Sequence, residues 1–286
     1  MKDLAVVTTL IGKRHENIAK HCHPTQERYA QSCGADFIVY DGRQYHVNPG
    51  LETSHKIASN RPSVRSETFA KEIKSMRQNT TIAPAFGSYN KLNVVELLKY
   101  YKRVLYIDTD IIIRNDSPNI FKIVPEDKVG MVNESNFTLQ DREENMRHWA
   151  ELFNLEYVKW NKKYYNGGLF LISRGQEDLL LPPEKLYDDY FYEQTLINWN
   201  IVNKKINMYD LSYKFNRVFY MDDCLNESKY NSYFIHYAGS WTILPEGHSE
   251  EAIELVRLIK NDLLQWEEGS PKHQYDQAEN SFWPRD

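Results

Sequence analysis

Long apolar runs, paired cysteines and an excess of basic residues are all missing from this chain of 286 residues. No segment reaches the roughly 18 consecutive apolar residues that a membrane-spanning helix needs. The N-terminal run MKDLAVVTTLIG is too short for the apolar region of a signal peptide and continues directly into a predicted strand. We therefore expect no transmembrane segment and no signal peptide, while peripheral association with a membrane stays open.

The cysteine and charge content limits the compartment and the partners. Cys22, Cys33 and Cys224 are odd in number and form no Cys-x-x-Cys pair, so we interpret them as free thiols of a cytoplasmic protein. The net charge of −5 argues against a nucleic-acid partner, which usually requires a basic excess. Twenty tyrosines suit either a surface that binds other molecules or an ordinary tyrosine-rich core. No pattern predicts the oligomeric state.

Strands and helices alternate along the first part of the chain. Short apolar segments are predicted as strands at 3–11, 35–41 and 103–108. Helices are predicted at 14–32, 63–77 and 88–101, the last with Ser88 as N-cap, and a loop at 42–62. This alternation predicts a parallel sheet with helices on both faces, whose ligands bind beyond the carboxyl ends of the strands.

The second part of the chain continues the α/β pattern less regularly. Strands are predicted at 128–134, 167–173 and 233–239, and helices at 141–160, 190–203 and 249–266. Residues 268–286 are polar and are predicted to form a loosely held tail. Without an internal repeat or a long linker, the chain is expected to form one α/β domain over residues 1–267. Its central sheet is expected to be mixed, mostly parallel and flanked by helices.

Two aspartates one residue apart follow an apolar strand in the segment VLYIDTDIII, residues 104–113. Asp108 and Asp110 would point the same way if the strand continued, because alternate residues of a strand share a face. Carboxylate oxygens suit Mg²⁺ or Mn²⁺, which keep coordination positions open for phosphate oxygens. An isolated Asp-x-Asp is often only a turn, but the helix, the strand and the second apolar run around this pair favour a metal site.

Residues 89–113, YNKLNVVELLKYYKRVLYIDTDIII, resemble the core of retaining glycosyltransferases with the nucleotide-sugar-binding, Rossmann-like GT-A fold. The similarity is greatest to glycosyltransferase family 8, which includes glycogenin and bacterial lipopolysaccharide glycosyltransferases, with family 34 as a second neighbour. Later segments match the family's motifs in order: YYNGGLFLISR at 164–174, YEQTLIN at 192–198, SYKFNRV at 212–218 and FIHYAGSW at 234–241. The resemblance extends over about residues 3–245 and is less specific for the sugar than for the fold.

The resemblance implies three groups of site residues. The metal ligands for Mn²⁺ or Mg²⁺ are expected to be Asp108, Asp110 and His236. The residues that bind the nucleotide sugar are expected to be Thr8, Thr9, Leu10, Asp41, Lys91, Asp108, Thr109, Asp110, Asn166, Gly167, Gly168, Gln194, Gly239 and Ser240. The catalytic residues are expected to be Glu193, Gln194 and Asn166.

Plainer explanations stay open for several of these residues. His236 lies in an apolar strand, where a histidine is often only part of the core. Thr8 and Thr9 also fit simple β-propensity. Gly167 and Gly168 either let the backbone approach the sugar closely or mark a bulge in the strand.

The chain departs from the family 8 pattern at two positions. The closing motif HYAGSWTILP lacks the lysine that touches the diphosphate in family 8 and is nearer to the family 34 form. Neutralisation of the diphosphate is therefore expected to rely on the metal and on Lys91. Glu193 stands where the family has aspartate, and it is expected to stabilise the oxocarbenium-like centre or to contact the acceptor. Asn166 and Gln194 are expected to bind the hydroxyls of the donor sugar.

The function implied is metal-dependent transfer of a hexose from a nucleotide sugar to a hydroxyl acceptor such as a glycan, with retention of configuration. UDP is the expected nucleotide and GDP stays open; residues 1–115 would bind the nucleotide and residues 116–267 the acceptor. One alternative is a non-catalytic nucleotide-sugar-binding module, against which the intact Asp-Thr-Asp motif counts. A metal-dependent phosphohydrolase is the weaker alternative, because the Asp-x-Asp-x-Thr motif of such enzymes has Ile112 in its last position here.

Overall fold

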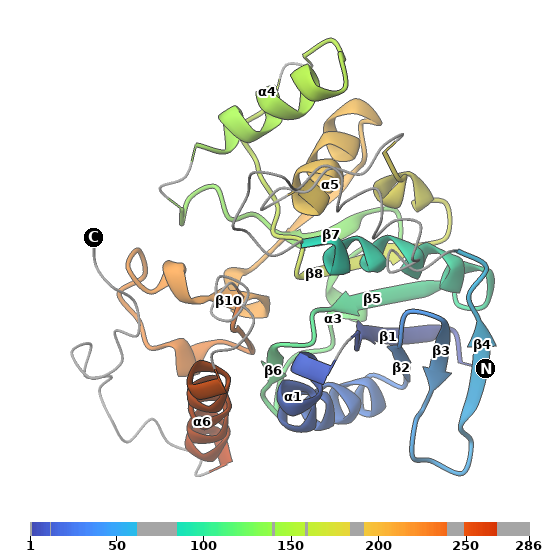
Figure 1. Ribbon diagram of the computed structural model, residues 1–286, viewed down its shortest axis with the longest axis vertical. Coiled ribbons are helices and arrows are strands. Elements are labelled where there is room, and N and C mark those ends of the chain that lie inside the picture. Colours follow the sequence, from blue (N-terminus) through green and yellow to red (C-terminus); the bar gives the residue numbers. More distant parts are fainter. Residues whose placement is uncertain are drawn as a thin grey trace.

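A large mixed β-sheet forms the centre of the molecule, with helices over both of its faces (Figure 1). The computed structural model describes residues 2–11, 13–61, 85–138, 141–157, 160–183, 192–238 and 249–267. The strands of this sheet are β1 (Leu4–Thr9), β2 (Asp36–Tyr40), β3 (Gln44–Val47), β4 (His55–Ala58), β5 (Arg103–Ile107), β7 (Val129–Val132), β8 (Leu169–Ser173) and β9 (Met208–Leu211), in the spatial order β4-β3-β2-β1-β5-β8-β7-β9. The predicted helix at 63–77, the predicted tail at 268–286, and Gly239 and Ser240 lie outside the described residues.

The strand pairing confirms an α/β fold with a mixed sheet but corrects its details. Strand β1 pairs in parallel with β2 and β5, and β7 pairs in parallel with β9. The pairs β2–β3, β3–β4, β5–β8 and β7–β8 are antiparallel, so the sheet is not mostly parallel as expected. The strands β3 and β4 lie inside the segment 42–62 that was predicted to be loop. They form a hairpin that extends the sheet at its edge, which short strands with few apolar residues do not reveal in the sequence.

A smaller sheet begins where the Asp-Thr-Asp segment ends. It contains β10 (Arg217–Val218), β11 (Phe234–His236) and β6 (Ile111–Ile113) in that spatial order. Strand β6 pairs antiparallel with β11, and His236 lies opposite Ile111. The chain therefore leaves the large sheet after β5, turns through Asp108 and Asp110, and enters the small sheet directly beside His236.

Helices bury both faces of the large sheet. The helices of the described residues are α1 (Lys13–Ser32), the 3₁₀ helix η1 (Ala85–Lys99), α3 (Ile120–Ile123), α4 (Arg142–Leu152), η2 (Glu177–Leu180), α5 (Tyr192–Asn203), η3 (Tyr213–Phe215), η4 (Phe219–Met221), η5 (Lys229–Asn231) and α6 (Ser249–Glu267). Of these, α6 packs with α1 against Ile112 and Ile235 of the small sheet rather than on the large sheet. Successive side chains of β1 serve opposite faces: Ala5 packs in the cluster that includes η1, α4 and α5, whereas Val6 packs in the cluster that includes α1 and α3. Helix α4 is shorter than the predicted 141–160, since Asn154 adopts a left-handed φ of 50° two residues after its end.

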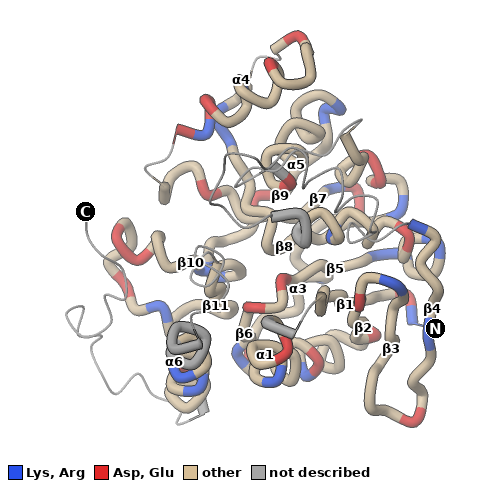
Figure 2. Tube along the Cα trace, viewed as in Figure 1, with Lys and Arg blue, Asp and Glu red and all other residues tan. Residues whose placement is uncertain are grey.

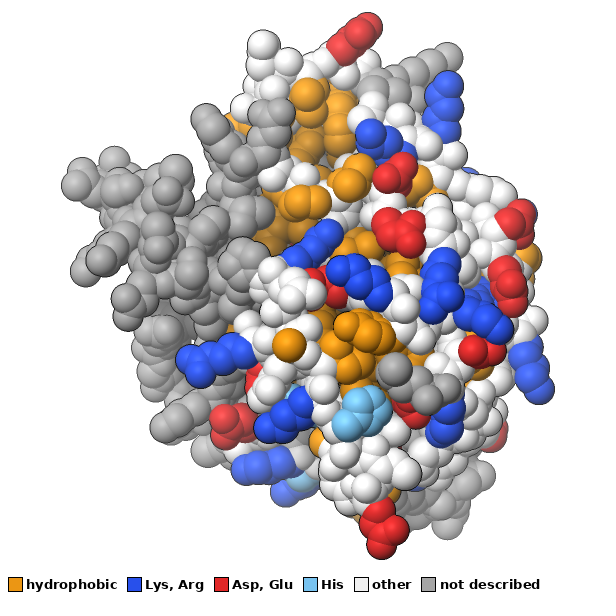
Figure 3. All heavy atoms as spheres, turned by 90° about the vertical axis from the view of Figure 1, so that its right-hand side faces the viewer, with side chains coloured by type: hydrophobic (Ala, Val, Ile, Leu, Met, Phe, Trp, Pro, Cys, Tyr) orange, Lys and Arg blue, Asp and Glu red, His pale blue; other side chains and the backbone are white. Residues whose placement is uncertain are grey.

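Charges of both signs are spread over the described chain (Figure 2). The face shown in Figure 3 likewise mixes hydrophobic side chains with Lys, Arg, Asp and Glu rather than presenting one sign. This distribution agrees with the modest net charge of −5. Within the described residues, every helix is too short or too polar to cross a membrane.

Candidate active site

Asp108, Asp110 and His236 converge at the junction of the two sheets. One potential ligand atom from each lies within 4.8 Å of the other two. The His236 Nε2 atom is 3.3 Å from an oxygen of Asp110 and 3.7 Å from an oxygen of Asp108. Asp110 and His236 are buried, while Asp108 keeps a partly exposed edge. Two carboxylates and one imidazole form a donor set that fits Mn²⁺ or Mg²⁺ and leaves one side of the site accessible.

The hydrogen bond behind the His236 ring points its second nitrogen at the carboxylates. The Nδ1 atom lies 2.7 Å from the side-chain oxygen of Asn216, to which it donates its proton. The Nε2 atom therefore carries the lone pair that a metal ligand requires. Gly168 leaves room for the ring, because a Cβ atom there would lie 2.2 Å from His236 Cε1. The sequence alone could not separate a ligand from a core histidine, and these contacts favour the ligand.

Hydrogen bonds to several other segments of the chain fix the turn that contains Asp108 and Asp110. The Asp108 amide donates to the Gly168 carbonyl at 2.8 Å. From α1, the Gln26 side chain donates to the carbonyls of Asp108 at 3.0 Å and Ile111 at 2.9 Å. The Tyr237 amide donates to the Asp110 carbonyl at 3.1 Å. Sequence reasoning missed Gln26, since a single glutamine in a polar helix gives no signal of its own.

Lys91 links the metal cluster to the expected catalytic carboxylate. Its Nζ lies 3.4 Å from Asp108 and 3.2 Å from Glu193, and it donates to the Gly167 carbonyl at 3.1 Å. Burial alone would lower the pKa of Lys91, but Asp108 and Glu193 outweigh it and raise that pKa. Burial raises the pKa of Asp108; Lys91 opposes this effect and the like charge of Asp110 adds to it. The cluster therefore has too little positive charge for its carboxylates, which a divalent cation would supply.

Asn166 and Gln194 meet at a buried carboxylate that the sequence did not single out. The side-chain amide of Asn166 donates to Glu134 at 2.8 Å, and that of Gln194 donates to Glu134 at 3.0 Å. The Gln194 oxygen accepts from the Gly167 amide at 2.9 Å. Arg142 balances the Glu134 charge at 2.5 Å. The only sequence signal for Glu134 was its place as the last residue of the strand predicted at 128–134.

The residues expected around the nucleoside lie at the ends of β1 and β2. The Thr8 and Thr109 hydroxyls are 3.5 Å apart, and the Thr109 hydroxyl donates to the Thr9 carbonyl. The Leu10 amide donates to the Tyr40 carbonyl at 2.8 Å, which keeps β1 beside β2 at this rim. The structure thus brings Thr8 and Thr9 to the Asp-Thr-Asp segment, as the strand order requires.

Asp41 shares this rim but is engaged in a turn. Its carboxylate accepts from the amides of Arg43 at 2.8 Å and Gln44 at 2.9 Å, and it lies 2.7 Å from His46 Nε2. Burial would raise the pKa of Asp41, but His46 and the two amides together lower it. Asp41 therefore closes the β2–β3 hairpin, and a role in nucleotide binding stays a prediction.

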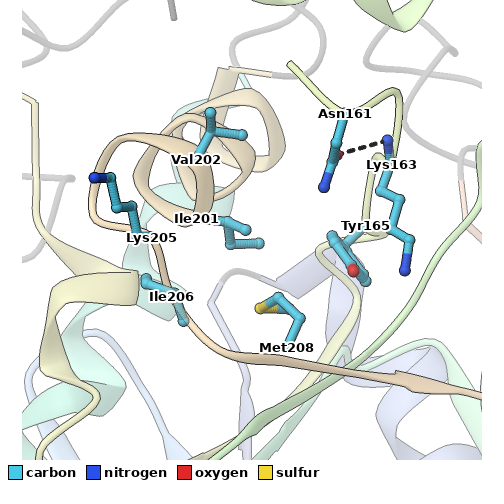
Figure 4. A pocket seen from close by; sticks show the side chains of 8 residues that line it. All are labelled: Asn161, Lys163, Tyr165, Ile201, Val202, Lys205, Ile206 and Met208. Atoms are coloured by element: carbon cyan, nitrogen blue, oxygen red, sulfur yellow. Dashed lines mark hydrogen bonds between the residues drawn. The ribbon is translucent and has the colours of Figure 1, made fainter. Parts of the chain in front are cut away.

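A separate hollow lies away from the metal cluster, between the end of α5 and the edge strand β9 (Figure 4). Its lining residues are Asn161, Lys163, Tyr165, Ile201, Val202, Lys205, Ile206 and Met208. None of the predicted site residues lines it. Lys163 and Tyr165 both contact Asp210, at 2.5 and 2.7 Å, so these two polar side chains of the hollow are already paired.

The family comparison identifies this chain as a glycosyltransferase, in agreement with the expected GT-A fold. The model of the family "Glycosyl transferase family 8" matches residues 46–242, and the chain therefore belongs to glycosyltransferase family 8. Comparison with curated protein sequences finds no significant match. The family resemblance that the sequence motifs suggested is thus confirmed.

One solved glycosyltransferase structure shares this fold at low sequence identity with a TM-score of 0.50, and two further ones are similar at lower scores. An active-site mutant of LgtC is 12% identical with a TM-score of 0.50, covering 90% of this chain and 95% of its own. The galactosyltransferase LgtC with donor and acceptor sugar analogues is 13% identical with a TM-score of 0.46, covering 90% of this chain and 95% of that one. A glycosyltransferase that glycosylates the major capsid of PBCV-1 is 12% identical with a TM-score of 0.48, covering 90% and 98%.

Proposed function

We propose that this glycosyltransferase moves a hexose from a UDP-sugar to a hydroxyl acceptor such as a glycan, with retention of configuration and with bound Mn²⁺ or Mg²⁺. The observation that carries the proposal is the cluster of Asp108, Asp110 and His236, in which the lone pair of Nε2 faces both carboxylates. These three side chains would hold the metal at the partly exposed edge of Asp108. Bound there, the cation would offset the negative charge that develops on the leaving diphosphate.

Lys91 is assigned to the carboxylates rather than to the diphosphate. The lysine is buried and already lies within 3.4 Å of Asp108 and 3.2 Å of Glu193. It therefore holds the Glu193 carboxylate at a fixed distance from the metal cluster. In this position Glu193 would stabilise positive charge at the anomeric carbon, while the leaving phosphate takes the proton of the acceptor.

Gln194 is better suited than Asn166 to bind a sugar hydroxyl. The oxygen of Asn166 already accepts from the Gly168 amide at 2.9 Å and from Asn216 at 2.8 Å, and its amide nitrogen donates to Glu134. Among the described residues, the Gln194 side chain makes one hydrogen bond through its oxygen and one through its nitrogen, which leaves one acceptor position and one hydrogen. We therefore assign the contact with the donor sugar to Gln194.

The nucleoside is assigned to the rim formed by Thr8, Thr9, Leu10 and Thr109, with Asp41, Gly239 and Ser240 as further expected contacts. In this arrangement residues 1–115 bind the nucleotide and residues 116–267 form the acceptor side. The free thiols of Cys22, Cys33 and Cys224 support a reducing, cytoplasmic compartment as part of the proposal.

Release of UDP from UDP-sugars in the presence of Mn²⁺ tests the proposal. We expect the wild-type protein to release UDP and to show a Mn²⁺-dependent rise in melting temperature. Asp110→Ala should abolish both, because the cluster then keeps only one carboxylate and the imidazole. Asp127→Ala is the matched control, since Asp127 is exposed and outside the cluster.

Two outcomes would contradict the proposal. An unchanged Mn²⁺-dependent shift in Asp110→Ala would remove the metal site. Tight binding of UDP-sugars with Mn²⁺ but no release of UDP from any of them would support the non-catalytic binding module instead.

A further inference from the structure

Glu134 is surrounded by four side-chain donors at the centre of the site. It lies two residues after the end of β7 and is fully buried. Its Oε1 atom accepts from Arg142 at 2.5 Å and from Gln194 at 3.0 Å. Its Oε2 atom accepts from Asn166 at 2.8 Å and from the hydroxyl of Tyr220. A carboxylate has about four acceptor positions, so all of them are occupied by the protein itself.

One branch of this network leads to the metal ligand. Because Asn166 turns its amide nitrogen toward Glu134, its oxygen faces Asn216, which donates to it at 2.8 Å. Asn216 must then turn its own oxygen toward His236, whose Nδ1 lies 2.7 Å away. The Glu134 carboxylate therefore fixes the orientation of the Asn166 amide, Asn166 fixes that of Asn216, and Asn216 fixes that of the imidazole.

The other branch leads to the sugar side. Gln194 turns its nitrogen toward Glu134, and its oxygen accepts from the Gly167 amide at 2.9 Å. The carbonyl of Gly167 in turn accepts from Lys91 at 3.1 Å. One buried carboxylate thus orients both the amide expected to bind the sugar and the imidazole expected to bind the metal.

Arg142 supplies the charge that Glu134 needs. It is the first residue of α4, its side chain is 4% exposed, and its guanidinium carbon lies 4.9 Å from the centre of the Tyr164 ring. An apolar pair of similar volume is often as stable as a buried ion pair, so stability alone does not explain these charges. An apolar residue at 134 would accept no hydrogen bond, and both amides would be free to turn over.

We propose that Glu134 and Arg142 form a positioning pair that sets the tautomer of His236 and the orientation of Gln194. This inference rests on the proposed function of the same site and deepens it, since neither residue is among the proposed metal ligands or sugar contacts. The pair acts through Asn166 on the metal side and directly on Gln194 on the sugar side.

The test uses the full chain with variants at the pair and matched variants on the surface. Glu134→Gln keeps the shape of the side chain. It replaces one acceptor oxygen with an NH₂ group, which points at side chains that are themselves donors. Because it removes the carboxylate that balances the buried Arg142 charge, the double variant Glu134→Gln with Arg142→Met is made as well. The controls are Glu144→Gln and Arg147→Met, which make the same changes at exposed positions of α4.

Two readouts distinguish positioning from a merely structural role. Nitrogen-15 NMR of the histidines, with His236 assigned from His236→Gln, should show the Nδ1-protonated tautomer in the wild type and its loss in the double variant. Titration with Mn²⁺ alone, followed by electron paramagnetic resonance, should show affinity reduced about 10–100-fold in the double variant. The controls should match the wild type in both readouts.

A folded double variant with the wild-type tautomer and wild-type Mn²⁺ affinity would overturn the positioning role. Failure of the proposed function looks different: the wild type and both controls would then bind no Mn²⁺. In that case the positioning role for a metal site is overturned too, even if the NMR shows that the pair sets the tautomer.

Discussion

Because Gly168 has no side chain, the His236 ring of the metal cluster fits beside it. Its amide donates to Asn166 and its carbonyl accepts from the Asp108 amide, so its backbone is fixed on both sides. The space beside its Cα is filled by the His236 ring. The family resemblance suggested a glycine whose backbone approaches the sugar, which stays a prediction, and the contacts show that this glycine also leaves room for the His236 ring.

Gly168→Ala should therefore damage the cluster. The new Cβ would lie 2.2 Å from His236 Cε1 and 2.8 Å from Nδ1, so the ring must move. We expect Mn²⁺ affinity to fall at least about tenfold and the free energy of unfolding to fall by about 1–3 kcal/mol. Metal titration and urea unfolding measure the two effects.

Gly167→Ala is the matched control for that variant. A Cβ at this position would lie 3.5 Å from Gln194 Cβ, which is an ordinary contact. We expect nearly unchanged stability and Mn²⁺ affinity. Equal effects of the two substitutions would show that the ring has room to move and that Gly168 is not special.

At the scale of elements, the turn between β5 and β6 depends on α1. The Gln26 side chain is fully buried and donates to two carbonyls of this turn, three residues apart. The two aspartates belong to neither β5 nor β6, so hydrogen bonds from α1 help to fix the turn that strand pairing does not include.

Gln26→Leu should loosen the turn while keeping the volume of the side chain. Two buried carbonyls lose a donor, and we expect a loss of about 1–3 kcal/mol in unfolding free energy together with weaker Mn²⁺ binding. Gln31→Leu, at an exposed position of the same helix, should leave metal binding unchanged. If Gln26→Leu lost stability but kept full Mn²⁺ affinity, the turn would keep its shape without the two hydrogen bonds from Gln26.

The sequence predicted elements where the apolar pattern is strong and missed those where it is weak. The completely buried strands β2, β5 and β8 were predicted near their observed bounds. The hairpin β3–β4 was not predicted, because its strands carry polar side chains on an open edge. The family resemblance placed Asp108, Asp110 and His236 in one site, and the three side chains do lie together, while their binding of a metal stays a prediction. Glu134 and Gln26 could not be predicted, since their partners lie far away in the sequence.

At the scale of the whole molecule, the stability in acid should depend on His23. Its ring packs edge-on against Phe37, with 5.9 Å between ring centres, and burial lowers its pKa from 6.5 to about 4. The unfolded chain therefore takes up a proton at a higher pH than the folded chain does. The stabilising contribution is complete above pH 6.5 and is lost as the pH falls toward 4.

His23→Phe should remove this loss. Allowing for the partly exposed ring, we expect the variant to keep about 2 kcal/mol that the wild type loses between pH 6.5 and 4. Unfolding by urea at several pH values measures it, and His148→Phe, at an exposed position of α4, is the control. If the free energy of unfolding changed with pH in the same way in the wild type and in His23→Phe, His23 would not cause the loss of stability in acid.

The change of sheet between Asp108 and Asp110 has a mechanical consequence. Asp108 directly follows β5 of the large sheet, whereas Asp110 directly precedes β6 of the small sheet and His236 ends its strand β11. An ion bound by all three residues would link the two sheets at their junction. Adding Mn²⁺ should then slow amide hydrogen exchange in β6, β10 and β11 more than in the distant hairpin β3–β4, so the small sheet would report occupancy of the site through its own rigidity.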